Sequence, residues 1–211
     1  MSALVEIMLE EEGVIRRGHF IGASGRHLDT YVNKNVLNTN PKKVQVLGSY
    51  IAQLCAHLNI DVVASPAAGA VALGHEVAKR IREAQFVFTE KVSEQDGAGH
   101  STERQGLKRG YDQVVNGRRV LVVEDIVTTG GSLLSVVDAR KKAGGIPVGA
   151  SAIVNRSPGT VGSEVFGVPF IPLLNLDLQS WSDESVPDVL KRVPIDTSIG
   201  HGAAYVANQH K

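Results

Sequence analysis

Short apolar runs alternate with segments of helical period in the middle of the chain. Five of these runs have the length and composition of buried strands: residues 60–64 (IDVVA), 85–88 (QFVF), 119–123 (RVLVV), 146–154 (IPVGASAIV) and 168–173 (VPFIPL). Between them, residues 71–82 and 133–144 carry apolar side chains at helical spacing. Near-continuous apolar strands that alternate with helices are typical of parallel βαβ units. The pattern therefore predicts an α/β fold with a mostly parallel central sheet flanked by helices.

Other patterns occupy the two ends of the chain and one internal segment. Residues 2–12 and about 41–58 are predicted helices, and the segment between them is predicted to form strands with turns. Residues 175–211 carry tryptophan and prolines in irregular order and are predicted to form an appendage. Residues 89–106 (TEKVSEQDGAGHSTERQG) are polar, contain glycine and have no apolar period, which predicts a long mobile loop.

Composition narrows the class of protein. The chain has 211 residues, as expected for one domain, and it is 43% hydrophobic, which is enough for a sizeable core. Lys+Arg 22 balances Asp+Glu 22, so no charge excess favours nucleic acid or a membrane surface as partner. The single cysteine, Cys55, excludes an internal disulfide framework and fits a reducing compartment. With neither a signal-peptide pattern nor a run of about 20 apolar residues, the sequence predicts a soluble cytoplasmic protein.

The stretch VVEDIVTTGGS at 122–132 carries the candidate chemistry, because it follows a predicted buried strand and leads into a predicted helix. Ligands of open parallel sheets bind at this edge. Glu124 and Asp125 are acceptors for sugar hydroxyls or, through water, for Mg²⁺, and they converge on one ligand only if the chain turns there. The residues that follow offer hydroxyls and backbone N–H groups to an anion, and together these features suit a ribose 5-phosphate. The alternative is an ordinary polar turn capped by Ser or Thr.

These residues resemble the ribose-phosphate signature of the type I phosphoribosyltransferases. Further segments resemble the orotate phosphoribosyltransferases in particular: GHFIGASGRHLDTYVNK near the N-terminus, LKRGYD before the motif, AIVNRS after it, and PLLNLDLQSW with VPDVLKRVPI in the tail. The resemblance implies one phosphoribosyltransferase domain of the type I fold, with a hood from about 1–40 and 175–211. It also implies phosphoribosyl pyrophosphate and orotate as substrates, Mg²⁺ as cofactor and a homodimer.

The resemblance also implies roles for individual residues. Glu124 and Asp125 would bind the ribose hydroxyls. The 5′-phosphate loop would comprise Ile126, Val127, Thr128, Thr129, Gly130, Gly131 and Ser132. The pyrophosphate loop would comprise Ser65, Pro66, Ala67, Ala68 and Gly69, although a tight turn of any α/β protein explains this stretch equally well. Arg156 would hold the orotate carboxylate as a bidentate partner; the alternative is a surface arginine after a strand.

Residues 89–109 would form the mobile catalytic loop, with Lys91 and Arg109 as candidate catalytic cations beside Asp125, and His100 as a weaker candidate. The loop departs from one family pattern, R-K-x-x-K-x-H-G, because acids stand at 90, 94 and 96. The lysine that some members carry before Ser24 is Ala23 here. Two alternatives therefore stay open: a phosphoribosyltransferase for a purine or another base, and a non-catalytic regulator that binds phosphoribosyl pyrophosphate or nucleotide.

Overall fold

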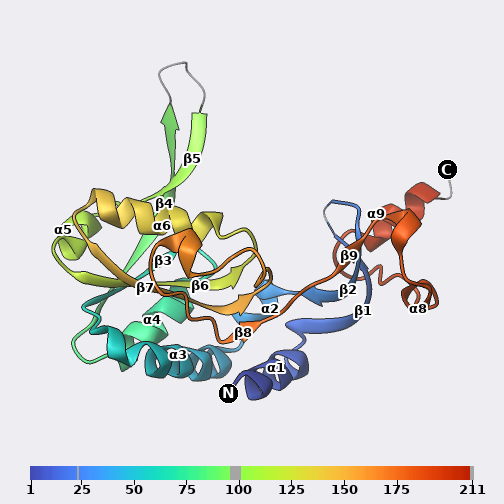
Figure 1. Ribbon diagram of the computed structural model, residues 1–211, viewed down its shortest axis with the longest axis horizontal. Coiled ribbons are helices and arrows are strands. Elements are labelled where there is room, and N and C mark those ends of the chain that lie inside the picture. The colour runs from blue at the N-terminus through green and yellow to red at the C-terminus, as the bar shows by residue number, and fades with distance from the viewer. Residues whose placement is uncertain (23, 96–100, 210–211) are drawn as a thin grey trace. The chain divides into compact units, whose positions relative to one another are not determined.

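The computed structural model describes residues 1–22, 24–95 and 101–209 (Figure 1). The chain divides into two compact units. We call Met1–Val5 with Asn38–Leu176 the core unit, and Glu6–Leu37 with Asp177–Lys211 the terminal unit. The terminal unit is thus built from segments at both ends of the chain, and helix α1 (Ser2–Glu11) starts in one unit and ends in the other.

A six-stranded sheet forms the centre of the core unit, in the order β5-β4-β3-β6-β7-β8. Its strands are β3 (Val62–Pro66), β4 (Gln85–Gln95), β5 (Ser101–Gly106), β6 (Arg119–Val127), β7 (Ile146–Asn155) and β8 (Leu174–Asn175). All neighbours pair in parallel except β4 and β5, which are antiparallel. The expected α/β class is confirmed, and the strands expected at 60–64, 85–88, 119–123 and 146–154 all correspond to strands of this sheet, of which β4 and β6 extend further than expected, to Gln95 and Val127.

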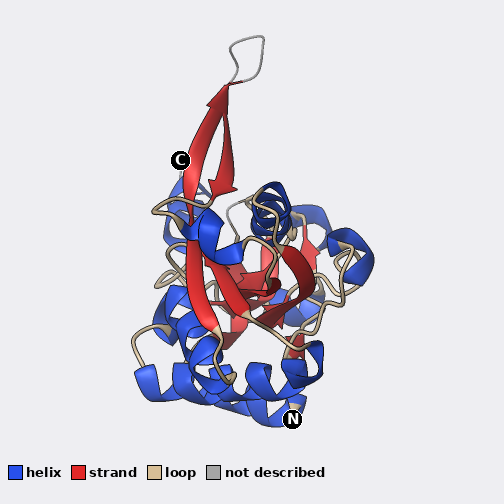
Figure 2. Cartoon of the chain, turned by 90° about the vertical axis from the view of Figure 1, so that its left-hand side faces the viewer, coloured by secondary structure: helices blue, strands red, loops and turns tan. Residues whose placement is uncertain are grey.

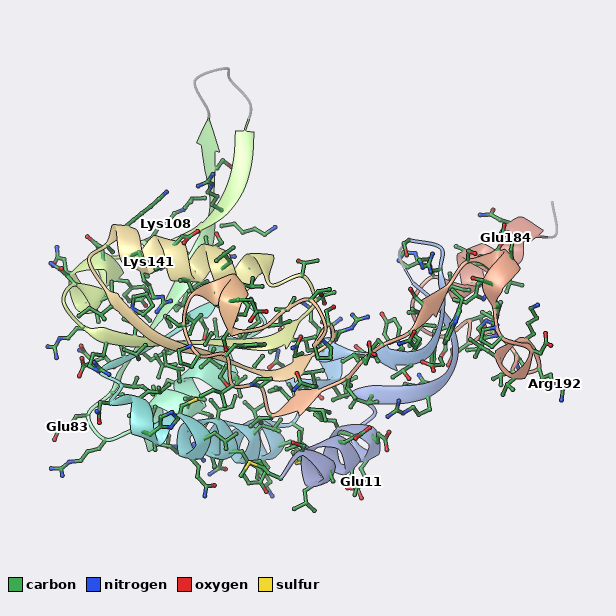
Figure 3. The ribbon with its side chains drawn as sticks, in the orientation of Figure 1. Glu11, Glu83, Lys108, Lys141, Glu184 and Arg192 are labelled. Atoms are coloured by element: carbon green, nitrogen blue, oxygen red, sulfur yellow. The ribbon has the colours of Figure 1, made fainter. Side chains whose placement is uncertain are left out.

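Helices cover both faces of this sheet. They are α3 (Pro41–Cys55), α4 (Val71–Arg80), α5 (Tyr111–Val115), α6 (Gly131–Lys142), α7 (Ser163–Phe166) and a 3-10 turn at Ala56–Leu58. Figure 1 shows α6 on one face and α3 with α4 on the other. Side chains fill the space between sheet and helices (Figure 3). On the α6 face, valines of β3, β4 and β6 pack against Leu133, Val136 and Val137, and this buried cluster fixes α6 directly behind the end of β6.

Within the segment expected to be a long loop at 89–106, residues 89–95 and 101–106 belong to two paired strands, which we call the hairpin, so the prediction of a loop is wrong for these residues. The prediction for residues 96–100 lies outside the described residues. Strand β4 continues from the sheet to Gln95, and β5 pairs with it from Glu90↔Gly106 to Gln95↔Ser101. Figure 2 shows the two strands extending together from the sheet. Most of these residues are polar, so the sequence shows no alternation of apolar and polar side chains typical of a strand. Backbone hydrogen bonds hold this pair of strands, so no apolar alternation marks them in the sequence.

The prediction of a strand at 168–173 is also wrong. That segment contributes one isolated bridge, Ala150↔Phe170, and the sheet resumes only at the short β8. Pro169 and Pro172 explain the interruption, since neither has an N–H to donate to a ladder.

The terminal unit contains a small antiparallel sheet in the order β1-β2-β9. Its elements are β1 (Ile15–Ile21), β2 (His27–Val32), α2 (Lys34–Leu37), β9 (Ser180–Trp181), a 3-10 turn at Asp183–Ser185, α8 (Asp188–Lys191) and α9 (Gly202–Gln209). Arg16 on β1 pairs with Asp196 at 2.9 Å, which joins the two ends of the chain within this unit. Across the described ranges of both units, every helix is too short or too polar to cross a membrane.

Candidate functional site

The acid pair lies inside β6, not at a turn. Glu124 pairs with Ala152 and Ile126 with Val154, so the strand stays extended through Asp125 and ends at Val127. The expected turn at the acids is therefore wrong, because the parallel ladder with β7 continues past them. Alternation along an extended strand points the two side chains to opposite faces, Glu124 toward the α6 side and Asp125 toward the α4 side. Both are buried, at 7% and 3% exposed.

Asp125 has one satisfied and one unsatisfied carboxylate oxygen. Oδ1 accepts the backbone N–H of Ile126 at 2.6 Å. Oδ2 is buried, and within the part of the chain that the structure describes it has no hydrogen-bond partner. A Cβ built on Gly69 would lie 2.5 Å from this oxygen. Since an unpaired buried carboxylate oxygen is costly, this atom is a site for a ligand hydroxyl or a metal-bound water, and only glycine leaves room beside it.

The loop that faces Asp125 joins β3 to α4. Its first residue, Ala67, donates its N–H to the carbonyl of Thr89 on β4 at 2.9 Å. Asn38 Nδ2 donates to the carbonyl of Gly69 at 3.0 Å, and the peptide between Ala67 and Ala68 is cis. Ser65 and Pro66, at the end of β3, are buried, whereas Ala68 is exposed. The loop is therefore anchored at its start and near its end, with its middle open to solvent.

A second loop joins β6 to α6. Gly130 has φ +77°, and a Cβ there would lie 3.2 Å from Cζ of Phe166, so both its backbone and its surroundings favour glycine. α6 begins at Gly131, and the first N–H groups of a helix have no partner within the helix. Four residues of this loop are exposed: Thr128, Thr129, Gly131 and Ser132. Hydroxyls, first-turn N–H groups and the positive end of the helix dipole make this loop an anion site.

Arg156 follows β7 at the same edge of the sheet. Its N–H donates to the carbonyl of Val127 at 2.8 Å, so its backbone is held against the last residue of β6. The residue is half-buried. The backbone of Arg156 therefore lies beside the position where β6 ends and the loop at 128–132 begins.

The two predicted catalytic cations lie on or next to the hairpin. Lys91 is exposed on β4, opposite Gln105 of β5. Arg109 lies just after β5; its Nη2 pairs with Glu90 Oε1 at 2.7 Å, and its guanidinium lies 5.7 Å from the ring centre of Phe88. The hydrogen bond from Arg109 lowers the pKa of the Glu90 carboxyl, and the same bond raises the pKa of Arg109. His100 and Ala23 lie outside the described residues.

Two further residues, Asn38 and Thr89, support the loop at 65–69 without having been predicted as site residues. Asn38 supports the carbonyl of Gly69 from a segment 31 residues earlier in the chain. Thr89, which is fully buried, supports Ala67 from β4. Neither residue lies in a motif, and each acts through contacts between distant segments, so only the folded arrangement reveals them.

Comparisons with known proteins agree with this geometry. The model of the phosphoribosyl transferase domain family matches residues 34–164. The orotate phosphoribosyltransferase of Caldanaerobacter subterraneus subsp. tengcongensis is 34% identical over 188 residues, covering 89% of this chain and 92% of the relative. That of Thermotoga maritima is 35% identical over 193 residues, covering 92% and 96%. The crystal structure of orotate phosphoribosyltransferase from Mycobacterium tuberculosis H37Rv matches with a TM-score of 0.63 at 26% identity, covering 83% of this chain and 95% of that one.

Proposed function

The chain belongs to the orotate phosphoribosyltransferases, of the phosphoribosyl transferase domain family, and from that membership we propose how its residues perform the reaction. The chain transfers the 5-phosphoribosyl group of phosphoribosyl pyrophosphate to orotate, giving orotidine 5′-monophosphate and pyrophosphate in pyrimidine biosynthesis. The observation that carries the assignment of residues is the unpartnered Oδ2 of Asp125, which faces the Gly69 loop at the same edge of the sheet as the anion loop of α6.

Binding of the donor is divided among three segments. The loop at 128–132 holds the 5′-phosphate through hydroxyls and N–H groups. Asp125 accepts hydrogen bonds from the ribose hydroxyls through its unpartnered Oδ2. Glu124 points to the other face of β6 and would reach the same ribose after a turn at the end of the strand. The loop at 65–69 offers its backbone to the diphosphate, and the room beside Gly69 brings the diphosphate close to Asp125. This division supports a donor that carries a phosphate at one end and a diphosphate at the other.

Substitution at the anomeric carbon of the ribose depends on charged side chains held in the right place and needs no covalent intermediate with the protein. The transition state is loose and cation-like, the bond to the diphosphate breaks, and the orotate nitrogen is already anionic. Orientation and neutralisation of the leaving group therefore supply most of the rate. We assign neutralisation to Lys91, and to Arg109 after it exchanges Glu90 for the diphosphate. Arg156 holds the carboxylate of orotate, for which a planar guanidinium is the best-matched side chain.

The cofactor proposed for this site is Mg²⁺, and the residues fit it. A buried carboxylate oxygen without a partner, next to a loop for diphosphate, is the oxygen-rich surrounding that this ion prefers. Asp125 and Glu124 would hold it through water, and when bound it adds positive charge to the leaving diphosphate. The roles assigned above to Lys91, Arg109 and Arg156 do not change when the ion is bound.

We propose further that the protein works as a homodimer in the cytoplasm, with no nucleic-acid or membrane partner. Charge balance and a single buried cysteine support this setting. Light scattering of the purified chain would give about twice the monomer mass, and a monomeric mass at working concentrations would contradict the dimer.

The reaction itself is tested by following the absorbance of orotate with phosphoribosyl pyrophosphate and Mg²⁺. We expect consumption of orotate that depends on both additions. Turnover with adenine, guanine or hypoxanthine in place of orotate would indicate a purine enzyme instead. Tight binding of the donor without turnover of any base would indicate a regulator. Activity that is lost without Mg²⁺ and recovered when Mg²⁺ is added back tests the cofactor independently of the acceptor base.

A further inference from the structure

Thr89 lies at the point where β4 leaves the parallel sheet and enters the hairpin. Pairing with β3 ends at Pro66↔Thr89, and pairing with β5 begins at Glu90↔Gly106. Thr89 is fully buried, and its carbonyl accepts the N–H of Ala67 at 2.9 Å. The backbone of this residue therefore holds the first residue of the pyrophosphate loop.

The side chain of Thr89 makes a second connection, to β5. Thr89 Oγ1 donates to Gln105 Oε1 at 2.8 Å. The backbone N–H of Gln105 then donates to Ser135 Oγ at 2.9 Å. Ser135 lies four residues beyond Gly131, where α6 leaves the anion loop. Three segments that the proposed function assigns to the donor are thus joined by one chain of hydrogen bonds.

Lys91 is placed by the same contacts. It lies opposite Gln105 across the hairpin, and residues that pair directly point to the same face. Thr89, two residues before Lys91 on β4, also points to that face. The hydrogen bond between Thr89 and Gln105 therefore runs beside the base of the Lys91 side chain.

Near its base the hairpin is also held by the ion pair between Arg109 and Glu90 and by the packing of Leu107 on the core cluster. An isolated two-stranded hairpin is marginally stable, and this one is mostly polar. A groove of about 600 Å³ lies between β5 and α6, lined by Gln105, Gly131 and Ser135 among others. The hydrogen bond between the Gln105 N–H and Ser135 Oγ links β5 to α6 beside this open groove. It adds to the packing of the two elements.

We propose that Thr89, Gln105 and Ser135 are positioning residues that hold the hairpin, and Lys91 with it, at a fixed place relative to the pyrophosphate and phosphate loops. This inference rests on the proposed function, because the position of Lys91 matters only if the diphosphate leaves beside it. None of the three needs to touch substrate. Their effect is on the geometry of the leaving-group contact, and small misplacements of such a contact are expensive in rate.

The kinetic test uses Thr89→Val, Ser135→Ala and the double variant, with Thr89→Ser as the conservative variant and Gln113→Ala, an exposed change on α5, as the control. We expect each of the first two to lower kcat about tenfold with KM for orotate within about twofold. Thr89→Ser and Gln113→Ala should stay near wild type. Because both residues act through Gln105, the double variant should lose less than the product of the single losses.

A merely structural role predicts another pattern. Thr89→Val would then lower thermal stability with kcat of the folded fraction unchanged, or Thr89→Ser would lose as much activity as Thr89→Val. Either result would overturn the proposal. Circular dichroism of each variant establishes the folded fraction, and the half-buried Ser135 provides a variant that does not disturb the core if Thr89→Val fails to fold.

A measurement without substrate separates this proposal from the function on which it rests. Backbone hydrogen exchange of residues 104–106 should become about tenfold faster in Thr89→Val and in Ser135→Ala, and should be unchanged in Gln113→Ala. If wild-type protein consumed no orotate, the proposed function would fail while the exchange experiment still decided whether the connection holds the hairpin. Unchanged hydrogen exchange in both Thr89→Val and Ser135→Ala would contradict the positioning role even if the enzyme were active.

Discussion

At the scale of single residues, Asp125 combines burial, negative charge and an unpartnered oxygen within the described structure. Asp125→Asn keeps the shape and the acceptor for Ile126 but removes the charge. We expect KM for phosphoribosyl pyrophosphate to rise and kcat to fall, each about tenfold or more, through lost contacts to ribose and cofactor. The thermal midpoint should hold or rise, since an uncompensated buried charge disappears. Steady-state kinetics with a melting curve tests both; wild-type kinetics would refute the role, and the exposed Asp138→Asn is the control.

Gly69 offers a steric test of the same contact. An alanine Cβ would lie 2.5 Å from Asp125 Oδ2, so the carboxylate or the loop must shift. We expect Gly69→Ala to weaken donor binding about tenfold, measured by titration calorimetry with phosphoribosyl pyrophosphate. Gly159→Ala, at a position with nothing within 4 Å of the added atom, is the matched control and should bind normally. Equal affinities for the two variants would show that the Gly69 loop does not face the donor.

At the scale of elements, Gly48 of α3 lies in close contact with α4. A Cβ there would lie 2.9 Å from Glu76 Cβ and 3.2 Å from its backbone carbon. Gly48→Ala should overpack this contact at a cost of about 1–3 kcal/mol, partly offset by about 1 kcal/mol of helix propensity. Urea unfolding should therefore show a net loss near 1 kcal/mol. Gln53→Ala, exposed on the same helix, should be neutral, and a stabilised Gly48→Ala would mean that the helices separate without cost.

Elements whose signal is local were predictable from the sequence, and those that depend on distant contacts were not. The apolar runs of β3, β6 and β7 and the amphipathic α3 and α4 carry their pattern in a few adjacent residues. The hairpin of β4 and β5 carries none, because its residues are mostly polar and it is held by backbone pairing and by side-chain contacts with distant residues. The motif at 124–132 predicted the anion loop for the same local reason. The opposed directions of its two acids follow from pairing with β7, which no stretch of β6 reveals.

At the scale of the whole molecule, the two units depend on different kinds of interaction. The core unit has a large apolar cluster between its sheet and α6. The terminal unit contains several polar contacts between residues more than 150 positions apart, among them Arg16 with Asp196 and His27 with Asp183. The terminal unit also buries apolar side chains such as Phe20, Ile21 and Val186. Its long-range charged contacts respond directly to pH, so acid should act on them.

The lowered pKa of Asp196 sets the direction in which stability changes with pH. Hydrogen bonds from Ser198, and then the charge of Arg16, hold the pKa of the Asp196 carboxyl below its ordinary value. A lowered folded-state pKa adds stability that is complete above about pH 4 and is lost as pH falls through the folded value. Asp196→Asn should therefore cost about 1 kcal/mol at pH 7, because partial exposure screens the pair. Urea unfolding at pH 7 and pH 3 should show this gap and then its narrowing in acid. A gap of the same size at both pH values would mean that the aspartate acts through packing rather than charge.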